Sequence, residues 1–213
     1  SVVQNVTDRV RNPFGLVVPE RFAGDDDPPA VYGYGDANAD FHVIGDRPAV
    51  HGGDDTGVPF TGSIAGERLQ GVLHETDFLA APYADEPDAS NCYLSYVFMG
   101  RRPPDPSPRE YADLERYFDT ELRAINAHIL LPVGEHAIDH VLEAYTTQRR
   151  KVGRDVDDAA LHATEIRGRG FLVVPIREPA EWTDEDEAAL VDRLNAIRHR
   201  DYRQTKGVAT RVG

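Results

Sequence analysis

Hydrophobic residues gather in four short runs that are separated by longer amphipathic segments. Each run is bounded by polar residues, glycine or proline, and three are rich in valine, isoleucine and leucine. The runs are FHVIG (41–45), CYLSYVF (92–98), HILLPVG (128–134) and FLVVPI (171–176). Short continuous apolar runs are typical of parallel strands that are buried on both faces. The pattern therefore predicts four strands in the interior of the protein.

The segments between the runs show helical periodicity. Apolar residues recur at spacings near 3.6 in 63–76, and 107–126 carries an apolar stripe after the start Ser-Pro-Arg-Glu, which is typical of a capped helix. Segments 135–145 and 183–199 are also predicted to be helical. Strands that alternate with helices predict an α/β protein. We expect a three-layer α/β/α sandwich with a central four-stranded parallel sheet.

The remaining segments carry weaker patterns. Residues 1–30 are rich in turn-forming residues and are expected to be irregular, whereas 149–170 is a charged excursion with room for one short helix. The tail 204–213 is expected to be flexible. A length of 213 residues suits one domain with a sizeable core, so we expect 1–213 to form a single domain.

The charge balance narrows the classes of partner. Lysine and arginine number 23 against 37 aspartates and glutamates, which gives a net charge of -14. Such a surface repels polyanions and disfavours a simple nucleic-acid binder. Acidic chains with few lysines are also typical of proteins that work in molar salt, where screening weakens this repulsion. We therefore expect a halophilic archaeal source, with an ordinary acidic cytosolic protein as the alternative.

The single cysteine, Cys92, limits the covalent and metal chemistry. One cysteine cannot build a disulfide framework or a multi-cysteine metal site within one chain. No apolar run reaches about 18 residues, and the first residues lack the charged-then-apolar pattern of a signal peptide. We expect a soluble, cytoplasmic protein without a membrane partner.

The most unusual stretch follows the first predicted strand. It reads VIGDRPAVHGGDDTGVPFTGSIAGERL (43–69) and combines glycines with a carboxylate, an arginine and an aromatic residue. Ligands of parallel α/β proteins bind beyond the carboxyl ends of the strands. This loop is therefore the first candidate for a binding site.

Four blocks of the chain, in this order, resemble the uracil-DNA glycosylase superfamily, most nearly the family numbered four of bacteria and archaea. The blocks are YGYGDANADFHVIGDRPA, GVPFTGSIAGERL, SYVFMGRRPPDPSPREY and INAHILLPVGEHAIDHVL, and a loop PIREPAEW falls where the family has His-Pro-Ser. The resemblance covers about 31–198, and the G-x-P-F-x-G motif is its most specific part. It implies a protein that flips a uracil or other damaged base out of single-stranded or duplex DNA and hydrolyses its N-glycosidic bond. Separately, we expect a monomer.

The resemblance assigns roles to the residues of the opening loop. Gly45 matches the first loop, and Asp46 replaces the family's glutamate, so it would position the attacking water. Arg47 replaces a small residue and would narrow the pocket. Phe60 would lie under the flipped base. The alternatives are a capping role for Asp46 and a core position for Phe60.

Two further matches depart from the family. Tyr96 replaces the asparagine that reads the uracil edge, and it can stack or donate once but cannot reproduce the amide pair. Glu178 replaces the catalytic histidine, and an ionised glutamate would repel the departing uracil anion. Either Arg177 supplies positive charge, or Glu178 is protonated, or the loop has lost its role. His51 is a candidate replacement for the histidine, with a merely exposed loop residue as the alternative.

Other residues are candidates for contacts with the DNA backbone. The resemblance and the position at a helix start suggest Ser63, and the basic residues Arg101, Arg102 and Arg177 are the other candidates. The alternative for the first two arginines is a solvated turn.

The family's iron–sulfur cluster is predicted to be absent. Its ligand positions fall within 12–15, near Gly100 and near Leu114, and none holds a cysteine. We expect no cofactor and no metal. Three functions remain open: a DNA glycosylase with altered pocket chemistry, a non-catalytic descendant that binds a nucleic acid, nucleotide or protein through the same cleft, and an enzyme that acts on another small substrate.

Overall fold

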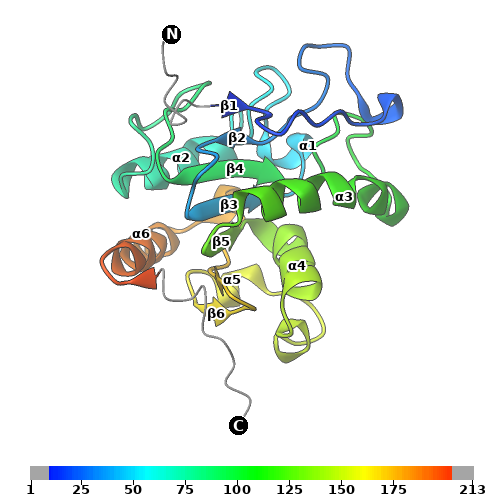
Figure 1. Cartoon of the computed structure of the whole chain (residues 1–213). Coiled ribbons are helices and arrows are strands. Elements are labelled where there is room, and N and C mark those ends of the chain that lie inside the picture. The colour runs from blue at the N-terminus through cyan, green and yellow to red at the C-terminus, as the bar shows by residue number, and fades with distance from the viewer. Residues whose placement is uncertain (1–9, 203–213) are drawn as a thin grey trace.

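A seven-stranded mixed sheet forms the centre of the computed structural model, which describes residues 10–202 (Figure 1). The strand order is β1-β2-β4-β3-β5-β7-β6. The four predicted strands are confirmed as its parallel centre, namely β3 (Phe41–Gly45), β4 (Cys92–Tyr96), β5 (Ile129–Pro132) and β7 (Leu172–Val173).

The sheet is larger than the predicted four strands. Three strands add to its edges in antiparallel orientation, namely β1 (Val10–Arg11), β2 (Tyr34–Gly35) and β6 (Ile166–Arg167). Each has two residues, which is too short to show either an apolar run or an alternation. The predicted flexible tail, 204–213, lies outside the described residues.

The four predicted helices are also present. They are α2 (Ile64–Glu75), α3 (Pro108–Ile125), α4 (Gly134–Tyr145) and α6 (Asp184–Arg198). The side chains of Ser63, Ser107 and Thr183 each accept a backbone N–H at a helix start, and the last two form full capping boxes. The shorter elements are η1 (Glu20–Phe22), α1 (Pro48–His51), η2 (Arg149–Lys151), α5 (Asp158–Leu161) and η3 (Pro179–Glu181).

The helices cover both faces of the sheet, which confirms the three-layer sandwich. Apolar residues of α2 and α6, such as Leu69 and Leu194, pack on Val43 in one core. On the opposite face, Phe118 of α3 packs in a second core with Ile44. Adjacent strand residues point to opposite faces, so Val43 and Ile44 serve the two cores. No helix within 10–202 has the length and hydropathy needed to cross a bilayer.

The strand register sets the position of the candidate site. Gly45 lies opposite Tyr96, Ile44 lies opposite Pro132, and an isolated parallel bridge joins Val133 to Ile176. The chain segments that follow β3, β4, β5 and β7 therefore leave the sheet at the same edge.

Candidate functional site

A cavity of about 330 Å³ opens at this carboxyl edge of the parallel strands. We call it the acidic cleft. Its lining comes from the segments after β3, β5 and β7 and from α5, and comprises Asp46, His51, Gly134, Glu135, His136, Asp158, Glu178 and Glu181. The two predicted catalytic residues, Asp46 and Glu178, are thus brought together, although they are far apart in the sequence.

The Asp46 carboxylate is held by two donors. The hydroxyl group of Tyr111, on α3, donates to Oδ1 at 2.5 Å, and Nη1 of Arg47 donates to Oδ2 at 2.8 Å. Burial and the contact with Asp46 raise the pKa of Tyr111, so the phenol keeps its proton. A carboxylate offers about four acceptor positions. The two contacts fix Asp46 and leave it able to accept a bond from a water molecule.

The hydrogen bonds of His51 determine its tautomer. The backbone N–H of Asp46 donates to Nδ1 at 2.9 Å, so this nitrogen carries no proton. The proton is therefore on Nε2, which donates to Oε2 of Glu178 at 2.7 Å. Protonation of Nδ1 would break the bond from Asp46. His51 is thus a neutral donor to Glu178 through Nε2.

Gly134 allows the close approach of Glu178 and His51. Its φ is +83°, and a Cβ atom there would lie 3.2 Å from Oε2 of Glu178. Gly134 also begins α4, whose N-cap residue makes no side-chain cap bond. Because a helix N-terminus carries partial positive charge, this end of α4 favours the negative charge of Glu178.

Two contacts hold the loop that carries Glu178. Its backbone N–H donates to Oδ2 of Asp158 at 2.9 Å. Arg68, on α2, donates from Nη1 to the carbonyl oxygens of Pro179, Ala180 and Trp182 at 2.9, 3.3 and 3.3 Å. The loop is therefore attached to both α5 and α2.

Negative charge dominates the acidic cleft. Five carboxylates line it, from Asp46, Glu135, Asp158, Glu178 and Glu181, and the remaining lining residues are glycine and two histidines. Burial, followed by the nearby carboxylates of Asp158 and Asp157, raises the pKa of Glu135. The guanidinium of Arg47 reaches Asp46 from the side but is not among the lining residues.

The predicted base-binding residues Gly45, Phe60 and Tyr96 are brought together behind the cleft. The rings of Phe60 and Tyr96 are fully buried, with centroids 5.4 Å apart. A Cβ atom at Gly45 would lie only 2.6 Å from Cζ of Phe60, so a side chain at Gly45 would clash with this ring. The Tyr96 hydroxyl accepts from the Phe60 N–H at 2.8 Å and donates to the Gly52 carbonyl at 2.8 Å. The ring of His51 packs on Phe60 at 5.3 Å. His51 lines the acidic cleft, whereas Phe60 and Tyr96 do not.

The predicted phosphate contacts have intramolecular partners. Oγ of Ser63 caps α2 and donates to the His51 carbonyl at 2.8 Å. Arg101 has a side chain only 6% exposed and lies near Asp26 and Asp54, and Arg102 pairs with Asp25 at 2.7 Å. Nη1 of Arg177 donates to Asp186 at 2.8 Å, so it does not supply charge to Glu178 by direct contact.

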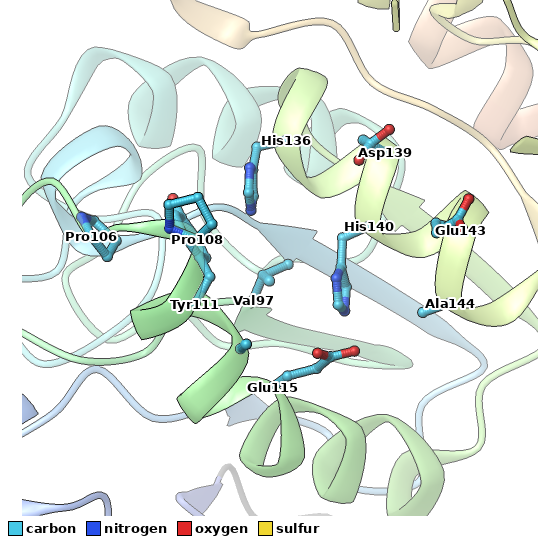
Figure 2. Close-up of a pocket in the computed structure, with 11 residues that line it drawn as sticks. Val97, Pro106, Pro108, Tyr111, Glu115, His136, Asp139, His140, Glu143 and Ala144 are labelled. Carbon is cyan, nitrogen blue, oxygen red and sulfur yellow. The ribbon is translucent and has the colours of Figure 1, made fainter. Parts of the chain in front are cut away.

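A second cavity, of about 540 Å³, lies between α3 and α4 (Figure 2). We call it the interhelix cavity. Val97 and His140 are among its lining residues, and it shares His136 with the acidic cleft. The rings of Tyr111 and His136 lie 4.1 Å apart at 32°. His136 thus borders both cavities, and its ring stacks on Tyr111.

The positions of the resembling family's cluster ligands do not fit an iron–sulfur cluster. They hold Asn12, Gly15, Gly100 and Leu114, which provide no thiolate. Leu114 is fully buried in an apolar group with Phe98 and Met99. Within 10–202 no group of three or more histidine, cysteine, aspartate or glutamate side chains is arranged to hold a metal ion. The absence of a cofactor stays a prediction.

Sequence reasoning missed the partners that complete the cleft. Tyr111 looked like part of a helix start, and no motif marked Asp158, Glu135 or Glu181. For His51 the sequence allowed two interpretations, a replacement for the missing histidine and a merely exposed loop residue. Its position five residues after Asp46, at the end of the single turn of α1, folds its ring back onto the Asp46 backbone.

Comparison with known proteins relates the chain to uracil-DNA glycosylases. The family model of the Uracil DNA glycosylase superfamily matches residues 32–196. The Type-5 uracil-DNA glycosylase of Thermus thermophilus is 31% identical over 117 residues, or 53% of each chain. The Type-5 uracil-DNA glycosylase of Pyrobaculum aerophilum is 30% identical over 135 residues, or 60% of each chain.

The chain thus spans 53–60% of the length of these relatives. Both carry the name of type five, whereas the motifs most resembled family four, and the subfamily stays a prediction. The halophilic archaeal source, the cytoplasmic location and the monomeric state also stay predictions. The match over 32–196 confirms the wider resemblance. The chain belongs to the uracil-DNA glycosylase superfamily.

Proposed function

We propose that this protein is a DNA glycosylase that hydrolyses the N-glycosidic bond of a damaged base flipped out of DNA. The observation that carries the proposal is the fixed Asp46 carboxylate. It lies directly after β3, lines the acidic cleft and is held by Tyr111 and Arg47. Membership of the superfamily supports the same assignment.

The arrangement suits the charge that develops in this reaction. As the bond to the base breaks, the deoxyribose becomes oxocarbenium-like, and a fixed carboxylate stabilises that positive charge. Asp46 also accepts a proton from the attacking water. Tyr111 and Arg47 prevent the carboxylate from rotating, so little reorganisation is needed during the reaction.

Two contacts keep this geometry in place. His51 accepts the backbone N–H of Asp46, and its other ring nitrogen is held by Glu178. His51 and Glu178 therefore act as positioning residues for Asp46 and do not donate to the leaving base.

The second candidate is binding without catalysis, and the burial of Phe60 favours it. Phe60 and Tyr96 are fully buried, and neither lines the acidic cleft. The aromatic platform expected under a flipped base is therefore not accessible in this conformation. A ligand in the cleft would contact mainly carboxylates.

Oligonucleotides with single modified bases test the two candidates. We expect release of at least one damaged base by the protein in molar salt, detected as alkali-labile strand breaks. Asp46→Asn should reduce the single-turnover rate about 100-fold or more, because it removes the charge at the sugar. Glu75→Gln, an exposed change at the end of α2, is the matched control and should keep the wild-type rate.

Tight binding without base release would reject the enzyme and support the second candidate. Neither binding nor release, with any modified base in single-stranded or duplex DNA, would reject the enzyme and the DNA-binding form of the second candidate.

A further inference from the structure

We propose that the acidic cleft selects a positively charged, N-alkylated base over uracil. This inference rests on the proposed function, because it names the substrate class of the same site. It concerns the chemistry of the leaving group and of the base edge, and both are set by the side chains around Asp46.

The charge of the cleft disfavours an anionic leaving group. Uracil departs as an anion, and it would do so beside five carboxylates. Two of these, Asp46 and Glu178, have side chains only 11% and 22% exposed, so solvent screens them poorly. Glu178 accepts the Nε2–H of the neutral His51 and faces the N-terminus of α4, and both contacts favour negative charge on its carboxyl group. Uracil therefore meets repulsion where a glycosylase acting on it needs a donor.

A cationic base reverses this effect. A purine alkylated at N7 or N3 carries a positive charge while attached to the sugar and leaves as a neutral molecule. The carboxylates stabilise the bound cation, and the departing base needs no donor. The substitution of Glu178 for the family's histidine then has a chemical reason, because the proton or charge supplied by that histidine is not required.

The base edge offers a second, independent argument. Uracil presents two carbonyl acceptors, which need donors. The Tyr96 hydroxyl, which stands in the place of the amide, is fully buried and bonded to Phe60 and Gly52. The cleft instead presents carboxylate acceptors, which pair with the exocyclic amino groups of adenine or guanine derivatives.

The hydrolytic step balances without a further reactant. The electron pair of the C1′–N bond moves onto the base and cancels its positive charge. The oxygen of a water molecule bonds to C1′, and Asp46 takes one proton from that water. The products are a neutral alkylated base, an abasic sugar with a hydroxyl at C1′, and one proton that Asp46 returns to solvent.

Matched oligonucleotides with N7-methylguanine, N3-methyladenine or uracil at one position test the inference. Release of the free base is measured by chromatography in single turnovers, and each rate is divided by the spontaneous rate without protein. We expect an enhancement at least about 10-fold larger for a methylated purine than for uracil. Because Glu178→Gln can disturb the His51 contact, the exposed residue Glu135 offers a second variant, Glu135→Gln.

Both variants should lower the ratio of methylpurine release to uracil release, whereas Glu75→Gln should not change it. Release of uracil that depends on Asp46, without release of methylpurines, would overturn this inference and leave the proposed function standing. An unchanged ratio in both glutamine variants would also overturn it. Release of no base at all, including uracil, would overturn the proposed function together with the inference.

Discussion

Two polar clusters lie along the central strands, one at their carboxyl edge and one beside β3 and β4, and they differ in their access to solvent. At the carboxyl end, His51 and Glu178 form a pair that lines the acidic cleft. Further back along β3 and β4, His42 bonds to Ser95 at 2.7 Å, and the Tyr93 hydroxyl donates to Glu121 of α3 at 2.6 Å. His42, Ser95 and Glu121 are all fully buried.

This difference in burial decides which groups are charged. Burial lowers the pKa of His42 to about 3 and raises that of Glu121 to about 7, so both favour their neutral forms. Nδ1 of His42 and Oε1 of Glu121 are buried without a hydrogen-bond partner. Glu178, by contrast, has a partly exposed side chain and lies close to Gly134 at the N-terminus of α4. The same residue types thus give a buried structural cluster beside β3 and β4 and an acidic cleft at the carboxyl edge.

The largest expected effect is a loss of stability when the packing behind the acidic cleft is disrupted. Phe60→Ala should destabilise the protein by about 3–5 kcal/mol, because Phe60 is fully buried against His51 and Tyr96. Urea unfolding measures the change, and Ile64→Ala, at a position 63% exposed, should change stability by less than about 0.5 kcal/mol. A loss of base release without a loss of stability would instead assign Phe60 to the base.

The second prediction tests whether burial keeps the carboxyl group of Glu121 neutral in the folded protein. The folded-state pKa of Glu121, about 7, lies above the ordinary glutamate value of 4.5, which we take for the unfolded chain. Between these values the unfolded chain loses its proton while the folded protein keeps it. Stability from this group is therefore present below pH 4.5 and falls by up to about 3 kcal/mol as the pH rises to 7.

Glu121→Gln should remove this fall, as measured by urea unfolding at pH 4.5, 5.5, 7 and 8. His42 opposes it, because its lowered pKa makes the folded state less stable as the pH falls below 6.5. This contribution is present in both proteins, so their difference isolates Glu121. The same slope in the Gln variant as in the parent would contradict the assignment, and Glu75→Gln should leave the slope unaltered.

The smallest expected effect concerns the His51–Glu178 pair that lines the acidic cleft. A double-mutant cycle with His51→Phe and Glu178→Gln should give a coupling energy of about 1–2 kcal/mol, since one partner is fully buried and the other is 22% exposed. The single and the double variant that lack His51 both leave the backbone N–H of Asp46 without its acceptor, so the energetic cost of this loss cancels in the cycle. A coupling below about 0.3 kcal/mol would show that the contact contributes little in solution.

The parts that the sequence could predict are those carried by local patterns. The four central strands and four long helices follow from apolar runs, periodicity and caps such as Ser107. The edge strands could not be found, because β1, β2 and β6 are too short to carry a pattern. The position of Asp46 followed from a motif at a strand end. The contact of Tyr111 with Asp46 did not, because it depends on how α3 packs across 65 residues of chain.

The depth of a side chain was equally hard to predict. Phe60 and Tyr96 occupy motif positions in an exposed-looking loop and strand end, yet both are fully buried. Their burial follows from the fold of loop 52–62, which the Tyr96 hydroxyl and Gln70 fix through bonds to Gly52 and Phe60. Such long-range polar contacts leave no periodic trace in the sequence.

The paired arginines have a consequence for any encounter with a nucleic acid. Arg47, Arg101, Arg102 and Arg177 each lie within 4 Å of an aspartate, so their counter-anions are covalently part of the same molecule. A phosphate that reaches one of them must compete with a carboxylate held at high effective concentration. The exchange releases few anions into solution. Binding through these arginines would therefore vary less steeply with salt than their number alone implies.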